Sequence, residues 1–205
     1  MQKFLLLLAV LGIMAVPLMA QDEYPKVEIF GGYQYFHNGQ LHIAGQDVPN
    51  SSENWNGWDT SVTGNFTKHL GVTGDFSGNY KTFDNVAGSG VNVDGRLYTF
   101  AGGPVVSYDA GGKINPFVHA LFGGAHASAS AAGQSLSHNV FIMMFGGGVD
   151  AKVAKHIKIR PIEFDWIYYH SGSFNVNISG FEVGTLPSFS QANNVRITSG
   201  IVFTF

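Results

Sequence analysis

The chain has 205 residues and a formal net charge of −3, and only 12% of its residues are charged although 45% are hydrophobic. That charged share is about half of the usual share in soluble domains, so it leaves a water-facing surface poorly covered. The net negative charge argues against a nucleic-acid partner. The lack of cysteine excludes disulfides and a lipid anchor attached through a thioether.

The N-terminal segment has the three parts of a secretory signal peptide. A short basic start at residues 1–3 precedes an apolar run at 4–16, and Ala20 stands before the polar residues 21–23. The apolar run is short for a membrane-spanning helix, and no later stretch has the length and apolar character of one. We therefore expect residues 1–20 to be a cleaved signal peptide and residues 21–205 to form one exported domain.

The exported region alternates apolar and polar residues, which is typical of half-buried strands. We expect strands at residues 26–36, 57–66, 70–80, 96–107, 114–127, 139–150, 157–170 and 194–205. Short turns are expected at 67–69, 108–113 and 152–156, and longer polar loops at 37–56, 81–94, 128–138 and 171–192. Long and short connections alternate between strands of about ten residues. This arrangement predicts an all-β fold, an eight-stranded antiparallel up-and-down transmembrane β-barrel with its short turns on one rim.

The last strand, residues 194–205, separates two faces clearly. One face carries Val195, Ile197, Ile201, Phe203 and Phe205, and the other carries Arg196 among mostly polar residues. An exposed C-terminal phenylalanine contributes little at the frayed end of a soluble domain, whereas in a membrane barrel it lies at the lipid interface. The ending resembles the C-terminal assembly signal of bacterial outer-membrane β-barrels, here Ile201, Phe203 and Phe205, which the barrel-assembly machinery recognises.

Several local patterns together resemble one known family. They are the opening strand with Phe-Gly-Gly-Tyr-Gln-Tyr at 30–35, glycine pairs at 102–103 and 123–124, and the Val-Phe-Thr-Phe ending at 202–205. The chain resembles the small outer-membrane β-barrels typified by the membrane domain of outer membrane protein A, over residues 24–205. The resemblance implies a monomer in the bacterial outer membrane, with outer-membrane lipid and the assembly machinery as partners and without a cofactor. A soluble lipocalin-like barrel is the rival fold, with apolar residues inside and polar residues outside.

A shared set of charges is expected inside the barrel, because a charge on the lipid face at mid-membrane costs about 2–4 kcal/mol. The expected lumen charge network consists of Glu28, Asp75, Arg96, Arg160, Glu163, Asp165 and Arg196. The facing of Arg96 stays open, because Tyr98 and Phe100 alternate in phase with it, and that of Arg160 stays open as well. An eight-stranded barrel is just wide enough for side chains to fill it, so the network is expected to plug the barrel. The alternative is a gate in which a carboxylate exchanges arginine partners.

Aromatic residues near the strand ends that face the long loops suggest an interfacial belt. They are Tyr33, Tyr35, Trp55, Trp58, Tyr80, Trp166, Tyr168 and Tyr169. We expect them to anchor the barrel rather than to form a sugar-binding platform.

Enzymatic and metal sites have little support in the sequence. The eight histidines lack the spacing of paired metal ligands, so neither a metal nor a cofactor is expected, and they are interpreted as hydrated or interfacial side chains. His126 and Ser128 are similar to the His-x-Ser pair of the lipid A deacylase family. Residues 139–144 lack the carboxylate that would orient the imidazole, so no catalytic residue is assigned.

The sequence thus predicts an integral outer-membrane barrel that is mainly structural, with at most a narrow passive pore. Two alternatives remain. One is an adhesin or interaction protein that binds an extracellular ligand through the loops at 37–56 and 171–192. The other is an outer-membrane lipid hydrolase.

Overall fold

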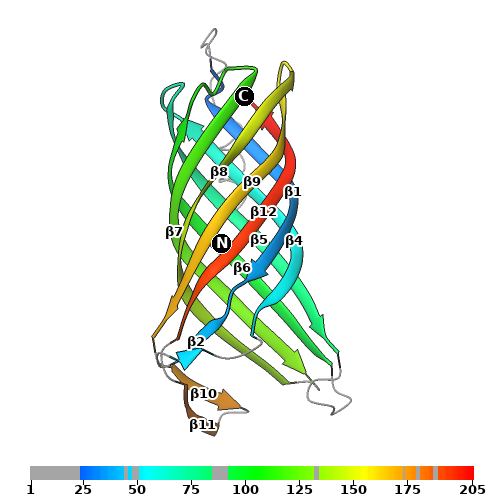
Figure 1. The fold of residues 1–205 in the computed structure, drawn as a ribbon, viewed down its shortest axis with the longest axis vertical. Helices are drawn as coiled ribbons and strands as arrows, with labels where there is room; N and C mark the ends of the chain where they lie inside the picture. Colours follow the sequence, from blue (N-terminus) through cyan, green and yellow to red (C-terminus); the bar gives the residue numbers. More distant parts are fainter. Residues whose placement is uncertain are drawn as a thin grey trace, which may run out of the picture.

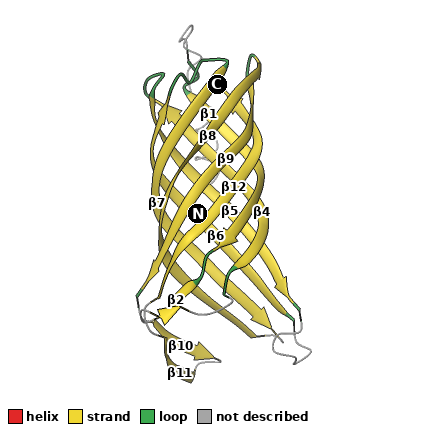
Figure 2. Ribbon diagram, viewed as in Figure 1, coloured by secondary structure: helices red, strands yellow, loops and turns green. Residues whose placement is uncertain are grey.

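The computed structural model describes residues 24–43, 46–47, 51–84, 92–131, 134–172, 174–178, 181–186 and 189–205. All regular structure in these residues is β-strand (Figure 2). The strands are β1 (Val27–Asn38), β2 (Leu41–Ile43), β3 (Gln46–Asp47), β4 (Glu53–Asn65), β5 (Leu70–Phe83), β6 (Val93–Ser107), β7 (Ile114–Ala131), β8 (Gln134–Ala154), β9 (Ile157–Ser171), β10 (Phe174–Ile178), β11 (Phe181–Leu186) and β12 (Phe189–Thr204). The expected signal peptide, residues 1–20, lies outside the described residues.

Within the described residues there is no helix with the length and apolar character needed to span a membrane.

Eight long strands close into a barrel. Strands β1, β4, β5, β6, β7, β8, β9 and β12 pair in this order, and β12 pairs antiparallel with β1. The closing register runs from Glu28 opposite Thr204 to His37 opposite Val195. Figure 1 shows the strands tilted around one axis, as closure of a sheet requires. The prediction of an eight-stranded antiparallel barrel is confirmed.

The two ends of the barrel differ. The turns between β4 and β5, β6 and β7, and β8 and β9 lie with the C-terminus at one end, called here the short-turn rim (Figure 1). Strand β2 and the hairpin β10–β11 lie at the opposite end, called the long-loop rim. There β2 extends the sheet by pairing with β12, with Phe189 opposite Ile43. Both chain segments expected as long loops at 37–56 and 171–192 therefore contain additional strand structure.

The expected loop at 128–138 is wrong. Strands β7 and β8 remain paired up to Ala131 opposite Gln134, which makes β8 a strand of 21 residues. This segment is rich in alanine and serine and lacks an alternation of large apolar and polar residues, so its sequence does not indicate a strand. Backbone hydrogen bonds, which do not depend on such a pattern, extend the hairpin.

The exterior is apolar and the interior largely polar. On β12, Ile197, Ile201 and Phe203 are exposed, while Arg196 and Thr198 are buried. The same alternation leaves Phe100 on β6 66% exposed. The expected parity of the closing strand is therefore correct, and this arrangement is the inverse of a lipocalin-like barrel.

Close backbone approach explains one of the glycines on β7. A Cβ added at Gly123 would lie 1.9 Å from the carbonyl oxygen of Phe100 on the neighbouring strand, whereas a Cβ at Gly124 would meet nothing nearer than 3.6 Å. We expect Gly123→Ala to lower the free energy of unfolding by about 1–3 kcal/mol, as overpacking does. The matched control, Gly124→Ala, leaves it nearly unchanged. Urea unfolding in detergent micelles measures both, and equal effects would refute the close-approach explanation.

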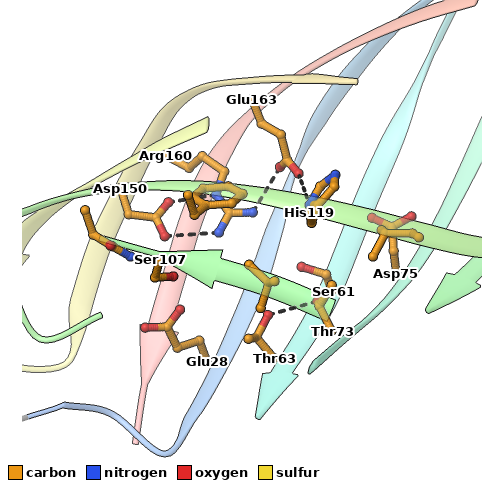
Figure 3. A pocket seen from close by; sticks show the side chains of 14 residues that line it. Glu28, Ser61, Thr63, Thr73, Asp75, Ser107, His119, Asp150, Arg160 and Glu163 are labelled. Carbon is orange, nitrogen blue, oxygen red and sulfur yellow. Dashed lines mark hydrogen bonds and ion pairs between the residues drawn. The ribbon is translucent and has the colours of Figure 1, made fainter. Parts of the chain in front are cut away.

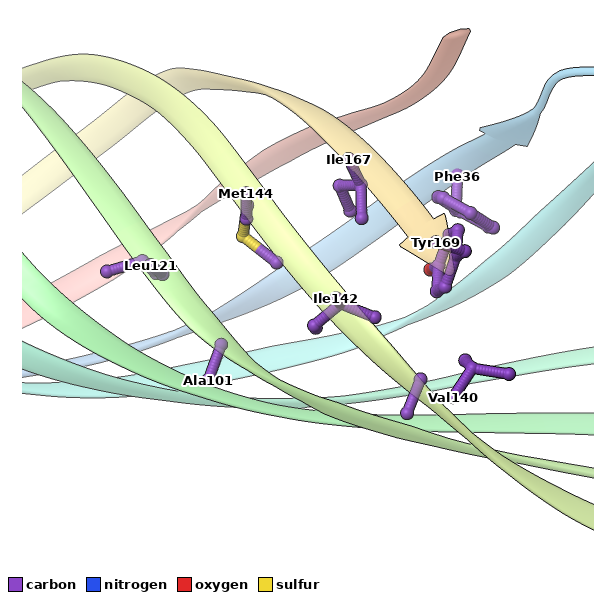
Figure 4. Close-up of a cluster of buried hydrophobic side chains, with 9 residues drawn as sticks. Phe36, Ala101, Leu121, Val140, Ile142, Met144, Ile167 and Tyr169 are labelled. Atoms are coloured by element: carbon purple, nitrogen blue, oxygen red, sulfur yellow. The ribbon is translucent and has the colours of Figure 1, made fainter. Parts of the chain in front are cut away.

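An apolar cluster fills the barrel interior toward the long-loop rim (Figure 4). Its buried members are Phe36, Ala101, Leu121, Ala125, Val140, Ile142, Met144, Ile167 and Tyr169, and Trp55 and Leu97 pack against it. Phe36 and Tyr169 meet edge to face with ring centroids 6.2 Å apart. Tyr169 and Trp55 were expected in the outer aromatic belt, and that assignment is wrong because both side chains belong to the interior packing.

Candidate functional site in the barrel interior

Arg196 on β12 is the centre of the first ion-pair group. Its Nη1 and Nη2 donate hydrogen bonds to the two carboxylate oxygens of Asp75 at 2.9 and 3.0 Å, and its Nε donates to Asp165 Oδ2 at 2.7 Å. The Met144 sulfur lies 3.1 Å from Nη2, where the apolar cluster begins. A bidentate arginine–carboxylate pair is among the strongest hydrogen-bonded pairs in proteins. Arg196 thus links β5, β9 and β12 across the lumen.

Asp59 on β4 is a further carboxylate beside this group. Its Oδ2 lies 3.6 Å from Arg196 Nη1, and neither of its oxygens accepts a hydrogen bond. The residue is only 2% exposed. Arg196 therefore faces three acidic residues, of which it hydrogen-bonds two.

Arg160 on β9 is the centre of a second group nearer the short-turn rim. Its Nε and Nη2 donate to Asp150 at 2.7 and 3.1 Å, and its Nη1 donates to Glu163 Oε2 at 2.9 Å (Figure 3). The guanidinium carbon of Arg160 also lies over the rings of Phe30 and Phe117, at 4.5 and 4.3 Å from their centroids. Such cation–π contacts stabilise a buried guanidinium in its position.

Lys158 closes the interior at the short-turn rim. Its Nζ donates to Glu28 Oε1 at 2.5 Å and to the carbonyl oxygen of Ala110 at 2.7 Å. Ala110 lies in the turn between β6 and β7, so this bond ties the turn over the barrel end. Lys158 is 2% exposed.

His119 on β7 connects the two arginine groups. Its Nε2 lies 2.6 Å from Asp165 Oδ1, and its Nδ1 lies 3.6 Å from Glu163 Oε1. Each of these carboxylates also accepts a bond from an arginine, Asp165 from Arg196 and Glu163 from Arg160. The interpretation of His119 as a hydrated or interfacial side chain is wrong, because the imidazole is buried in the lumen.

The interior also contains a small cavity beside these groups. Its volume is about 20 Å³, enough for about one water molecule. His119, Glu163, Arg160 and Asp75 contribute to its lining, as Figure 3 shows.

Six of the seven residues of the expected lumen charge network are buried inside the barrel: Glu28, Asp75, Arg160, Glu163, Asp165 and Arg196. Arg96 is not part of it. Its side chain is exposed on the outer face, since it alternates in phase with Phe100 and pairs across the strands with the exposed Tyr80. The expectation for Arg96 is therefore corrected.

Sequence reasoning missed four members of the interior set, namely Asp59, His119, Asp150 and Lys158. On β9 the inward positions change from even to odd numbers between Arg160 and Glu163. The ladder to β12 shifts register at this point, beside Pro161, which has no backbone N–H to donate. Counting backward from Glu163 in steps of two would place Lys158 outside. A proline within an otherwise regular strand is a signal for a bulge, and it could have indicated the change of face.

Ile201, Phe203 and Phe205, the expected assembly signal, are exposed on one face. The Phe205 carbonyl oxygen accepts hydrogen bonds from the backbone nitrogens of Lys26 and Val27 at 2.8 and 3.2 Å. The C-terminal residue is thus held in the barrel wall beside the start of β1.

The His-x-Ser pair is on the exterior of β7. His126 Nδ1 lies 2.7 Å from Asn139 Oδ1, so an amide occupies the place where an orienting carboxylate was sought. In the described part of the chain, no hydrogen bond joins His126 to Ser128. A proton-accepting contact with the hydroxyl is what activates a serine nucleophile, so this geometry gives no support to a hydrolase.

A closed antiparallel barrel with an apolar exterior and a charged interior defines an integral β-barrel of the outer membrane. The chain belongs to the family described as outer membrane protein beta-barrel domain, whose model matches residues 6–189. No curated protein sequence matches the chain.

Solved structures of outer-membrane proteins resemble the fold. Ail, the attachment invasion locus protein of Yersinia pestis, in complex with the heparin analogue sucrose octasulfate, has a TM-score of 0.54 at 18% identity, covering 89% of this chain and 99% of that one. Neisserial surface protein A has a TM-score of 0.59 at 11% identity, covering 88% and 97%. A major outer membrane protein of Thermus thermophilus has a TM-score of 0.59 at 12% identity, covering 87% and 99%. At these identities the similarity to the solved structures concerns the fold alone. The family match shows that the protein is an integral protein of the bacterial outer membrane.

Proposed function

We propose that the protein is a sealed structural barrel that presents its long-loop rim to an extracellular partner. The observation that supports the seal is that ion-paired and apolar side chains follow one another along the whole interior. Lys158 and Glu28 stand at the short-turn rim, the two arginine groups follow, and the apolar cluster fills the remainder toward the long-loop rim.

Passage of a solute would require these groups to separate. Breaking a buried ion pair costs about 3–5 kcal/mol, because each partner is left desolvated and unpaired. Arg196 alone holds two carboxylates from different strands. The proposed resting state is therefore closed to ions and small solutes.

The rim charge indicates the kind of partner. Within residues 37–56, 81–94, 128–138 and 171–192, Lys81 is the sole lysine or arginine, against Asp47, Glu53, Asp84, Asp94 and Glu182. Lys81 itself is ion-paired with Glu53. Such a rim repels polyanions, so we propose an uncharged or basic extracellular partner, in contrast to the sulfated ligand of the Ail complex.

A heparin column tests this part of the proposal. The folded protein in lipid nanodiscs is expected to pass through heparin–agarose unretained at physiological ionic strength. A variant with Asp47, Glu53, Asp84 and Asp94 all replaced by lysine serves as a control. It is expected to be retained because the net charge of the four loop ranges changes from −4 to +4. Retention of the wild type, at a salt concentration that elutes a neutral control barrel, would contradict the proposal.

Deletion of the β10–β11 hairpin tests whether the long-loop rim binds an extracellular partner. Replacing residues 174–186 by a short Gly-Ser linker removes β10 and β11, which pair with each other and not with the barrel sheet. The variant is expected to keep the electrophoretic shift between unheated and boiled samples that marks a folded barrel. It is expected to lose adhesion of expressing cells to surfaces coated with basic or uncharged extracellular proteins. Unchanged adhesion would exclude this hairpin as the contact.

A gate is the second candidate, and Asp59 is the observation that favours it. This carboxylate lies 3.6 Å from Arg196 Nη1 and accepts no hydrogen bond, so it is available if Arg196 releases another acid. If the exchange opens a water path, brief current steps in planar bilayers should become rarer in Asp59→Asn, whose side chain attracts the guanidinium less. Equal step frequencies in wild type and variant would count against the gate.

A further inference from the structure

We infer that the barrel interior binds one divalent transition-metal cation, with Zn²⁺ as the best-fitting example, between His119, Glu163 and Asp165. One ligand atom from each of the three buried side chains can be chosen so that all lie within 4.8 Å of one another. The residues come from two strands, with His119 on β7 and both carboxylates on β9. A ring nitrogen with two carboxylate oxygens is a ligand set that zinc accepts.

The interior charge inventory calls for additional positive charge. Among the described residues, six carboxylates are buried: Glu28, Asp59, Asp75, Asp150, Glu163 and Asp165. Three permanent cations are buried with them: Lys158, Arg160 and Arg196. With His119 neutral, three negative charges are uncompensated. Because an unpaired charge in a dry interior is strongly unfavourable, bound cations or protons must supply the difference, and one divalent cation supplies two charges.

Asp59 contributes to this uncompensated negative charge. It is not a member of the ligand group, it is 2% exposed, and neither of its oxygens has a hydrogen-bond partner. Its nearest cation is Arg196, at 3.6 Å, and that guanidinium is shared with Asp75 and Asp165.

The two arginines already orient the ligands. Glu163 gives Oε2 to Arg160 and turns Oε1 toward His119, while Asp165 gives Oδ2 to Arg196 and turns Oδ1 toward His119. Fixation of one carboxylate oxygen by a hydrogen bond while the other faces the metal is the usual role of the residues behind a metal site. His119 and Glu163 also line the cavity, which has room for about one water as a fourth ligand.

The ligand chemistry selects among metals. Ca²⁺ and Mg²⁺ prefer oxygen ligands alone, whereas an imidazole favours zinc and its first-row neighbours. Ligand atoms around a tetrahedral zinc are about 3.3 Å apart, given bonds of about 2.0 Å. The present separations of up to 4.8 Å therefore require side-chain movements on the order of 1 Å.

The test uses untagged full-length protein that is folded in detergent, stripped with a chelator and dialysed against Zn²⁺. Metal per chain is measured for the wild type, His119→Gln and His126→Gln, the last being the control because His126 is exposed on the barrel exterior. Folding of each is checked by the shift between unheated and boiled samples. We expect the wild type and His126→Gln to bind one equivalent more than His119→Gln.

Two results would overturn the inference: a folded wild type that binds no zinc, or a folded His119→Gln that binds as much as the wild type. If His119→Gln fails to fold, Glu163→Gln replaces it as a nearly isosteric variant. If that variant also fails, Co²⁺ binding to the wild type decides. Intense visible bands of low-coordinate Co²⁺ support an interior site, whereas only the weak bands of octahedral Co²⁺ refute it.

Discussion

Arg196→Met is expected to lower the free energy of unfolding by about 3–5 kcal/mol, because it leaves buried carboxylates without their cation. Asp75 and Asp165 would each lose hydrogen bonds to the guanidinium. Methionine has a similar length and would fill the space, so the loss reports charge rather than volume. Urea unfolding followed by tryptophan fluorescence in lipid vesicles measures the difference.

Arg96→Met is the matched control, since Arg96 is exposed on the outer face. A substitution there is expected to change the free energy by no more than about 0.5 kcal/mol. A quadruple variant with Arg196→Met, Asp59→Asn, Asp75→Asn and Asp165→Asn should recover part of the stability, because all three acidic residues that face Arg196 are then replaced by uncharged amides. Equal losses for Arg196→Met and Arg96→Met would disprove the interior role of Arg196.

Phe100→Lys is expected to destabilise the inserted barrel by about 2–4 kcal/mol if the position lies near the bilayer midplane. Phe100 is on the middle of β6 opposite Phe76, and 66% of it is exposed. In lipid vesicles the variant should fold less completely and more slowly than the wild type, while Phe100→Leu should fold normally. Quantification of the heat-modifiable band gives the folded fraction. Normal folding of Phe100→Lys would show that this face does not contact lipid.

The barrel and its faces could be predicted because burial on one side imposes a period of two on each strand. That period assigned Arg196, Glu163 and Asp165 to the interior without a structure. The same period left the facing of Arg96 open, because Tyr98 and Phe100 alternate in phase with it. Strand number and closure followed from the alternation of short turns with longer connections.

Other features depended on information that a local pattern lacks. The register shift beside Pro161 exchanges the two faces of β9. The alternation that places Glu163 and Asp165 inside therefore does not predict that Lys158 is also inside. His119 acquires its role from Asp165, 46 positions away in sequence. Tyr169 resembles a belt aromatic in sequence, but it packs against Phe36 inside the barrel. In these cases contacts between distant strands decide the outcome.

The central claim, that ion pairs and apolar side chains seal this outer-membrane barrel, is tested most directly by the conductance of the folded wild type in planar lipid bilayers. The account predicts no sustained current above the bare bilayer, while parallel samples from the same vesicles show the electrophoretic shift of a folded barrel. A stable ohmic current of uniform step size, present in preparations of the wild type at low voltage, would contradict it.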